Sequence, residues 1–295
     1  MIEENPDKVK EVIKKLKKLT HHKYIRITDC GNSAIFIALQ IAKKVNSRPY
    51  LLIPDQGGWI SFKRYPSFFN FKIKEIKTNY GLIDLEDLKE KVKDASAFIV
   101  TSFAGYFAEQ PIKEISKICK KHKCLLIEDA SGAVGDINLC KGKYSDIILG
   151  SFGKWKPINY GYGGFISTSD PKYFSYAKES FSMIKVHPEF YPGILSHLNT
   201  KRLNALLELS SKIKDELKDY DIIHKDKRGP NVVVKFNPGV VEYCKKNNYP
   251  YILCPNYIRV NEKAISIELK RLELNEIEKK KEDGKKKEKK KFKIF

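Results

Sequence analysis

A carboxylate and two lysines stand at the ends of two neighbouring predicted strands. Asp129 closes the apolar run 124–129, and the run 146–151 leads into a glycine-bordered loop that contains Lys154 and Lys156. A neutral lysine amine is a nucleophile and a base, whereas arginine stays protonated and can be neither. A lysine in a loop that faces a strand-end carboxylate therefore suits an aldehyde cofactor. The alternative for Asp129 is a cap on the helix that follows it.

The turn after the first predicted strand offers a place for an anion. Gly31, Asn32 and Ser33 follow the apolar run 24–28 and open a predicted helix. The first N–H groups of a helix have no partner within it and the helix dipole is positive there, so this turn is able to hold a phosphate. The alternative is an ordinary helix N-cap without a ligand.

Alternating apolar and amphipathic stretches predict the elements that position these residues. Strands are predicted at 24–28, 50–54, 71–76, 97–101, 124–129 and 146–151, and helices at 7–19, 33–44, 58–65, 84–92 and 111–121. Continuous apolar strands indicate a mainly parallel sheet covered on both faces, hence a three-layer α/β domain. Ligands of such sheets bind at the carboxyl ends of the strands.

The rhythm changes after residue 168 and predicts a smaller α+β unit. Helices are expected near 171–182, 198–219 and 238–246, and strands at 232–236, 251–255 and 257–260. We therefore expect a large domain over residues 1–170 and connecting helices with a small C-terminal domain over 171–278. Residues 279–295 form a lysine-rich tail that is expected to have little fixed structure.

Charge and hydropathy limit the functional classes. The 295 residues carry a formal net charge of +20, and the ten lysines and three acidic residues of the tail account for +7 of it. A basic tail is typical of a non-specific polyanion binder, so nucleic acid is expected only at residues 279–293; the commoner alternative is a solvated tail. No apolar run approaches the ~18 residues that span a bilayer, and the N-terminus lacks a signal-peptide core. We expect a cytoplasmic protein with no membrane partner.

The cysteines do not predict a metal site. None of the six forms a CxxC pair. Cys119 and Cys124 stand on either side of a helix–strand boundary, which is expected to direct their side chains to different faces. We therefore predict reduced thiols and no metal.

The lysine loop resembles a motif of the DegT/DnrJ/EryC1/StrS sugar aminotransferases, which are fold-type-I pyridoxal-phosphate enzymes. The family motif reads S-F-x-x-x-K, four residues, then G-E-G-G; residues 151–164 read S-F-G-K-W-K, four residues, then G-Y-G-G. This register selects Lys156, and not Lys154, as the Schiff-base lysine. Residues 127–136 resemble the family's IEDAAQAxG stretch, and order and spacing agree over about residues 24–215.

The resemblance implies which residues hold the ring of pyridoxal 5'-phosphate. Asp129 corresponds to the partner of the pyridine nitrogen, which it would keep protonated. Trp59, in the stretch 53–61, corresponds to the aromatic residue that stacks on the ring. Lys156 would then carry the aldehyde and move the substrate's Cα proton.

The resemblance also implies a set of phosphate contacts. Gly31, Asn32 and Ser33 fall where the family has its phosphate turn, and Ser151 corresponds to a phosphate-contacting serine. Asn199 resembles an asparagine that reaches the cofactor phosphate of the opposite subunit. A homodimer is therefore expected.

The implied reaction is ping-pong transamination, from an amino-acid donor to an oxo-sugar or a small oxo-acid acceptor. The sequence departs from the family pattern at three places that bear on substrate choice: Gly132 replaces a glutamine, Tyr162 replaces the glutamate of G-E-G-G, and Asn32 replaces a threonine. Tyr162 is for this reason a candidate substrate contact. Arg259, in 257–260, resembles the C-terminal strand arginine that binds the α-carboxylate in many amino-acid aminotransferases. The alternative is a surface-strand arginine.

Two other functions stay open from the sequence. The altered Gly132 and Tyr162 are compatible with a lyase or dehydratase that uses the same cofactor. A degenerate, non-catalytic homologue would bind nucleic acid through its basic surface. The presence of both Lys156 and Asp129 argues against the second, since a scaffold needs neither.

Overall fold

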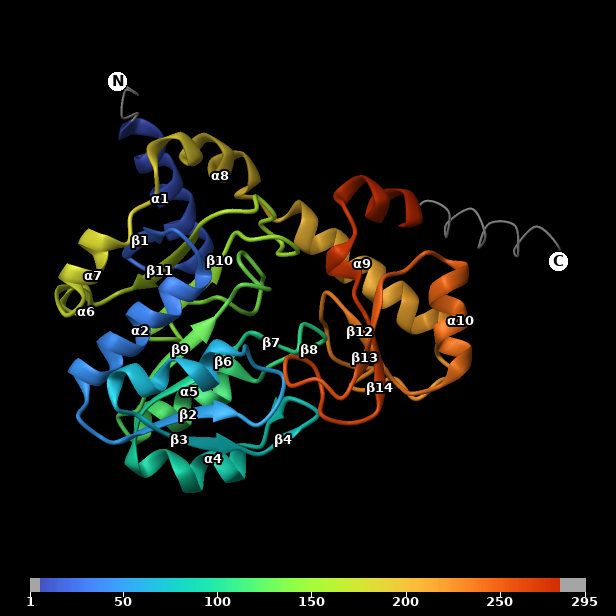
Figure 1. The fold of residues 1–295 in the computed structure, drawn as a ribbon, viewed down its shortest axis with the longest axis horizontal. Coiled ribbons are helices and arrows are strands. Elements are labelled where there is room, and N and C mark those ends of the chain that lie inside the picture. Colours follow the sequence, from blue (N-terminus) through green and yellow to red (C-terminus); the bar gives the residue numbers. More distant parts are fainter. Residues whose placement is uncertain (1–5, 282–295) are drawn as a thin grey trace.

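A seven-stranded sheet lies at the centre of the computed structural model, which describes residues 6–281 (Figure 1). Its strands lie in the order β1 (Tyr24–Thr28), β11 (Gly164–Thr168), β10 (Ile147–Ser151), β9 (Leu125–Asp129), β6 (Ala95–Thr101), β2 (Tyr50–Pro54) and β3 (Lys72–Ile76). The neighbours from β10 to β3 pair parallel, and β11 runs antiparallel to β1 and β10. The prediction of a mainly parallel sheet is therefore confirmed.

Helices cover both faces of this sheet, which gives three layers. One face, with Ile127 at its centre, packs against α2 (Gly31–Val45), with α3 (Ser61–Arg64), α6 (Pro171–Ser175) and α7 (Lys178–Met183) beside it. The other face, with Leu126, packs against α1 (Pro6–Thr20), α4 (Leu85–Lys91), α5 (Ile112–Lys121) and α8 (Tyr191–His197). Successive strand residues point to opposite faces, so a sheet covered on both sides needs the continuous apolar runs that the sequence has.

A smaller unit lies beside the large sheet, drawn in orange and red in Figure 1. It consists of the antiparallel strands β12 (Val232–Lys235), β14 (Ala264–Ile267) and β13 (Tyr251–Cys254), packed against α10 (Pro238–Lys246). The long helix α9 (Lys201–Glu216) leads into it and buries Leu206, Leu209 and Ile213 in its core. Residues 274–281 are helical, and Ile277 joins the same core.

The structure corrects three expectations about local structure. Residues 257–260, predicted as a strand, form a turn in which the N–H of Arg259 donates to the carbonyl of Asn256. The third strand of the small sheet is instead β14, which the sequence reading missed together with β11. The helix predicted near 171–182 is interrupted at Tyr176 and Ala177.

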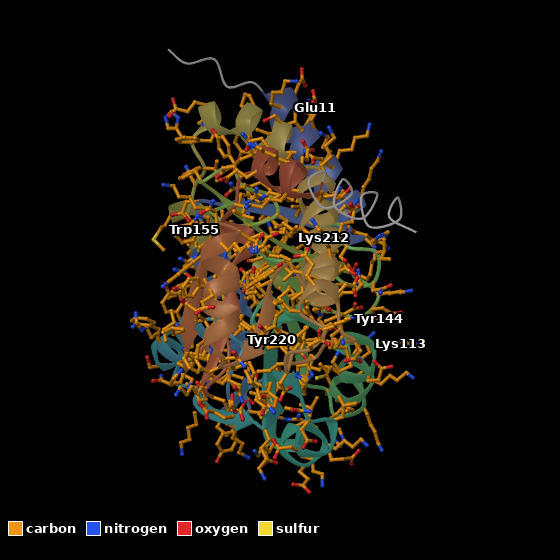
Figure 2. The ribbon with its side chains drawn as sticks, turned by 90° about the vertical axis from the view of Figure 1, so that its right-hand side faces the viewer. Glu11, Lys113, Tyr144, Trp155, Lys212 and Tyr220 are labelled. Carbon is orange, nitrogen blue, oxygen red and sulfur yellow. The ribbon has the colours of Figure 1, made fainter. Side chains whose placement is uncertain are left out.

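Two short hairpins stand at the carboxyl edge of the large sheet. They are β4 (Thr78–Asn79) with β5 (Leu82–Ile83), and β7 (Phe103–Ala104) with β8 (Ala108–Glu109). Charged side chains such as Glu11 and Lys113 are exposed and point away from the body of the molecule (Figure 2). Within residues 6–281, no helix combines the length and the apolar character needed to cross a membrane. The lysine-rich tail, predicted over residues 279–295 with little fixed structure, is helical at residues 279–281, where Lys281 pairs with Glu208; from residue 282 onward it lies outside the described residues.

Candidate active site

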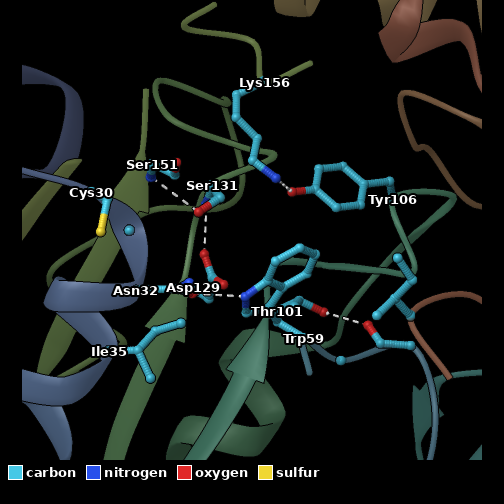
Figure 3. Close-up of a pocket in the computed structure, with 14 residues that line it drawn as sticks. Cys30, Asn32, Ile35, Trp59, Thr101, Tyr106, Asp129, Ser131, Ser151 and Lys156 are labelled. Atoms are coloured by element: carbon cyan, nitrogen blue, oxygen red, sulfur yellow. Dashed lines mark hydrogen bonds between the residues drawn. The ribbon is translucent and has the colours of Figure 1, made fainter. Parts of the chain in front are cut away.

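A cavity of about 140 Å³ opens where β9 and β10 end and α2 begins (Figure 3). Six residues that the sequence predicted at the site line it: Gly31, Asn32, Trp59, Asp129, Ser151 and Lys156. They come from segments up to about half the chain apart, which the parallel sheet brings to one edge. The cavity therefore joins the candidate lysine, the candidate carboxylate and the anion-binding turn.

Gly31 brings the N-terminus of α2 against the end of β10. A Cβ atom at this position would lie 2.7 Å from the Cβ of Ser151, closer than two carbon atoms can pack. The glycine thus lets the first N–H groups of the helix reach the cavity together with Ser151. These N–H groups and the positive end of the helix dipole favour an anion at this point.

The side chain of Asn32 holds Trp59 in place at the cavity wall. The amide oxygen of Asn32 accepts hydrogen bonds from the indole Nε1 of Trp59 at 2.9 Å and from the hydroxyl of Ser61 at 3.0 Å. The ring of Trp59 lies 5.3 Å from the Nζ atom of Lys156, measured to the ring centroid. Asn32, which replaces the family's threonine, therefore orients an aromatic wall beside the lysine.

Asp129 is a buried carboxylate at the floor of the cavity. It is 7% exposed, and the N–H of Ser131 donates to its Oδ1 atom at 2.9 Å. Burial raises the pKa of the Asp129 carboxyl, while hydrogen bonds from Ser131 and the charge of Lys156 oppose part of that rise. Asp129 has no ion pair within 4.0 Å among residues 6–281, and a cationic ring nitrogen in the cavity would supply one.

The neighbouring Glu128 has a different environment. Its carboxylate accepts hydrogen bonds from Ser102, Ser145 and the N–H of Cys140, at 2.6 to 2.9 Å. Alternation along β9 turns this side chain to the opposite face of the sheet. Glu128 is thus satisfied within the protein, and Asp129 is the carboxylate that faces the cavity.

Lys156 reaches into the cavity from the loop between β10 and β11. Its Nζ atom donates a hydrogen bond of 2.6 Å to the hydroxyl of Tyr106. Lys154 is exposed and does not line the cavity. The geometry thus agrees with the register that selects Lys156.

Some of the cavity residues were not anticipated from the sequence, above all Tyr106 and also Thr101 and Ser131. Thr101 ends β6, and its hydroxyl donates to the carbonyl of Gly57. Ser131 links the two candidate strands, because its hydroxyl accepts from the N–H of Ser151 at 3.0 Å. Their positions, Thr101 at the end of β6 and Ser131 two residues after β9, are a signal that would have found both.

Four predicted residues, Ser33, Tyr162, Asn199 and Arg259, do not line the cavity. Ser33 approaches Cys30 at the helix N-cap, and Tyr162 packs against Phe190 with ring centroids 4.2 Å apart. Asn199 is exposed, and its amide oxygen accepts from the N–H of Lys201 at the start of α9. The role expected of Asn199 concerns a second subunit and stays a prediction.

Arg259 is held by a buried carboxylate. It is 2% exposed and makes two hydrogen bonds of 2.7 Å to Glu268. Burial opposes ionisation of Glu268, but the charge and hydrogen bonds of Arg259 lower the pKa of this carboxyl to about 2. Arg259 is thus neither in a strand nor on the surface, and its guanidinium already has an anionic partner. Binding of a substrate carboxylate by Arg259 stays a prediction.

A buried lysine adjoins this ion pair. Lys270 is 5% exposed, and its Nζ atom lies 3.7 Å from the carboxylate of Glu268 and 4.8 Å from the ring centroid of Tyr106. Burial and the charge of Arg259 lower the pKa of the Lys270 amine to about 7. The region beside the cavity therefore carries more positive than negative charge.

Cys119 and Cys124 pack together in the core, contrary to the expectation that their side chains diverge. Their proximity and burial raise the pKa of the Cys119 thiol. Among residues 6–281, no three His, Cys, Asp or Glu side chains gather as a possible metal site.

A sequence profile of the DegT/DnrJ/EryC1/StrS aminotransferase family matches residues 3–187, which is more than half of the chain. The chain belongs to this family. Members are aminotransferase-like enzymes whose cofactor is pyridoxal 5'-phosphate, and the family resemblance expected from the lysine loop is confirmed. A second profile, the MJ1341 family C-terminal domain, matches residues 200–284, which contain α9 and the small sheet.

Two relatives match parts of the chain. A probable glycine dehydrogenase (decarboxylating) subunit 1 of Pyrococcus furiosus is 34% identical over 121 residues, which are 38% of this chain and 26% of that protein. The UDP-4-amino-4,6-dideoxy-N-acetyl-beta-L-altrosamine transaminase of Helicobacter pylori is 28% identical over 166 residues, 50% of this chain and 43% of that protein. The chain spans less than half the length of either relative in these matches.

Solved structures share the fold over almost the whole chain. An aminotransferase of pseudoaminic acid biosynthesis from Helicobacter pylori superposes with a TM-score of 0.71 at 14% identity, over 92% of this chain and 88% of that one. A cysteine desulfurase from Thermococcus onnurineus superposes with a TM-score of 0.69 at 13% identity, over 92% and 82%. The predicted fold, that of the fold-type-I pyridoxal-phosphate enzymes, is therefore confirmed.

Proposed function

We propose that the chain is a pyridoxal-phosphate-dependent aminotransferase that passes an amino group from an amino-acid donor to an oxo-sugar or small oxo-acid acceptor. The observation that carries this proposal is the position of Lys156 and Asp129 in one cavity, on either side of a space closed by Trp59. Membership of the aminotransferase family supports the same reaction class.

The residues of the cavity fit the cofactor. Asp129 is a buried carboxylate whose raised pKa marks the need for a cationic partner, and the pyridinium nitrogen is such a partner. The first N–H groups of α2 and the hydroxyl of Ser151 lie together because Gly31 has no side chain, and they suit a phosphate. Trp59, fixed by Asn32, would cover one face of the ring.

The chemistry divides between cofactor and protein. When bound, pyridoxal phosphate supplies the electron sink for the electrons released at the substrate's Cα. Asp129 would keep the ring nitrogen protonated, and Lys156 would hold the aldehyde and then carry the proton that leaves Cα. The neutral amine of Lys156 does this work, which an arginine at the same position cannot do.

The proposal extends to assembly and location. Asn199 stands exposed at the start of α9, where its side chain is open to a second copy of the chain. We therefore propose a homodimer in which it reaches the neighbouring subunit's phosphate site, in a cytoplasmic protein. We also propose that residues 1–170 form the cofactor domain, residues 171–281 the connecting helices and small domain, and residues 282–295 a separate tail.

The first experiment identifies the lysine. The purified protein is mixed with pyridoxal phosphate, reduced with borohydride, digested and mapped by mass spectrometry. A reduced adduct on Lys156 is expected, absent in Lys156→Arg and retained in the control Lys154→Arg. An adduct on Lys154 would overturn the register, and the lack of any adduct would refute the cofactor role.

A second experiment separates transamination from a competing reaction. One relative is described as decarboxylating, and Gly132 replaces the family's glutamine, so a lyase or decarboxylase with the same cofactor is the alternative. The loaded protein is incubated with glutamate and other common amino acids, and its absorbance is followed. Conversion to the pyridoxamine form is expected; release of carbon dioxide or ammonia without this conversion would favour the alternative.

A further inference from the structure

We propose that Tyr106 is the positioning residue of Lys156, and that its ring takes the space of the side chain that position 132 lacks. This role deepens the proposed function and rests on Lys156 being the cofactor lysine. It concerns a residue in the turn after β6, between the hairpin strands β7 and β8, that no sequence motif singled out. Figure 3 shows the hydroxyl of Tyr106 directed at the amine of Lys156.

The hydrogen bond between the two side chains is short and direct. The hydroxyl of Tyr106 lies 2.6 Å from the Nζ atom of Lys156 and can accept a hydrogen from the ammonium group. Hydrogen bonds to charged groups are stronger than those between neutral groups. Tyr106 therefore holds the lysine inside the cavity in the states in which the lysine is not attached to the cofactor.

Gly132 makes this arrangement possible. A Cβ atom at position 132 would lie 2.9 and 3.0 Å from the Cε1 and Cδ1 atoms of Tyr106. Any side chain at 132 thus collides with the ring as it stands. The glutamine that the family places at this position and the ring of Tyr106 cannot occupy the same space. The present position of the Tyr106 ring therefore requires a glycine at position 132.

The surroundings of Tyr106 fix the ring in this position. Its backbone is in the left-handed region at φ 71°, which a bulky residue adopts only when its neighbours hold it there. Its carbonyl accepts from the N–H of the buried Asn231, which precedes β12 of the small sheet. Arg259 and Lys270 lie 5.3 and 4.8 Å from the ring centroid. The Tyr106 ring is therefore held between the large domain and the smaller C-terminal unit.

The first test measures the chemical reactivity of the Lys156 amine in the absence of the cofactor. Cofactor-free protein is treated with trinitrobenzenesulfonate at fixed pH, and labelling of Lys156 is followed by peptide mass mapping. Only the neutral amine reacts, so loss of the hydrogen bond in Tyr106→Phe is expected to speed labelling of Lys156 about three- to tenfold. Tyr144→Phe, far from the cavity, is the control and should leave the rate unchanged. Equal rates in Tyr106→Phe and the unaltered protein would overturn the proposal.

The second test examines whether a side chain at position 132 and the ring of Tyr106 compete for the same space. Gly132→Gln should weaken pyridoxal-phosphate binding about tenfold or more by displacing the ring, and Tyr106→Ala should weaken it about three- to tenfold. The double variant should bind better than the product of the two single effects predicts, because glutamine then fills the vacated space. If the double variant's loss of affinity equals the product of the two single losses, the steric exclusion between a glutamine at position 132 and the Tyr106 ring is contradicted. Near-ultraviolet circular dichroism of each variant checks that it has folded.

The two proposals fail in different ways. If the protein forms no borohydride adduct at all, the proposed function fails, whereas the labelling test still reports on the hydrogen bond between Tyr106 and Lys156. If the adduct forms on Lys156 but Tyr106→Phe changes neither labelling nor the pH at which the cofactor's absorbance band changes, the function stands and the role of Tyr106 is wrong.

Discussion

Replacement of Glu268 by glutamine should strongly destabilise the protein. The carboxylate is fully buried, and two hydrogen bonds of 2.7 Å join it to Arg259. Folding lowers its pKa from 4.5 to about 2, which corresponds to about 3 kcal/mol of stability. In other proteins, removal of one partner from a buried ion pair lowers the free energy of unfolding by about 3–5 kcal/mol, because the remaining charge is left uncompensated. We therefore expect a loss of about 3–4 kcal/mol.

The pH dependence of this contribution has a definite sign. The carboxylate is more acidic in the folded chain than in the unfolded one, so its contribution is present in full above pH 4.5 and is lost as the pH falls toward 2. Guanidinium unfolding of the unaltered protein and of Glu268→Gln, repeated from pH 7 down to pH 3, measures both the size and the slope. The difference between the two proteins should shrink as the pH falls.

A double variant completes the measurement. Arg259→Met combined with Glu268→Met removes both charges, and its cost should be smaller than the sum of the single costs. A loss of stability below about 1 kcal/mol for Glu268→Gln would refute the reasoning, because a buried guanidinium without a carboxylate partner should destabilise the folded state by more than this. Such a result would mean that the Arg259 guanidinium leaves Glu268 easily and is free for a substrate carboxylate.

Three further predictions concern other parts of the molecule. Gly31→Ala should weaken cofactor binding about tenfold and cost about 1–3 kcal/mol of stability, since the new methyl group meets Ser151; unchanged affinity in an absorbance titration would contradict this. The pKa of Lys270 falls from 10.5 to about 7 on folding, so the unfolded chain holds more protons over this window and stability rises with pH across it. Lys270→Met should flatten that rise between pH 7 and 10 in denaturant unfolding. Removal of residues 282–295 should leave cofactor binding intact and reduce salt-sensitive binding of RNA or DNA in a mobility-shift assay, and equal nucleic-acid affinity would exclude the tail as the binding element.

The sequence was sufficient for those features that depend on strand ends and glycine placement. Asp129 ends one apolar run and Lys156 follows another, both runs are typical of buried strands, and the parallel arrangement then brings the two residues to one edge. Gly31 stands in the turn between a predicted strand and a predicted helix, and the structure adds its close approach to Ser151. These inferences need only the alternation of elements and the direction of the strands.

The sequence was insufficient where contacts depend on turns. Tyr106 reaches Lys156 only through a left-handed backbone conformation, which no periodic pattern announces. Arg259 was assigned to a strand because its neighbours are β-branched or aromatic, but a turn places it against Glu268 nine residues later. Pairing between buried charged side chains is a property of the packed core, and local composition does not encode it.

The hydrogen bond between the Tyr106 carbonyl and the N–H of Asn231 joins the candidate active-site cavity to the segment that leads into the small sheet. Any rotation of the smaller unit toward the large sheet would pull on the turn that carries Tyr106, and through it on the amine of Lys156. Thermodynamic linkage makes this coupling reciprocal: a ligand that draws the two units together alters the hold on the lysine, and release of the lysine alters the preference for the closed arrangement. This backbone hydrogen bond would thus make the reactivity of the Lys156 amine depend on the position of the small unit.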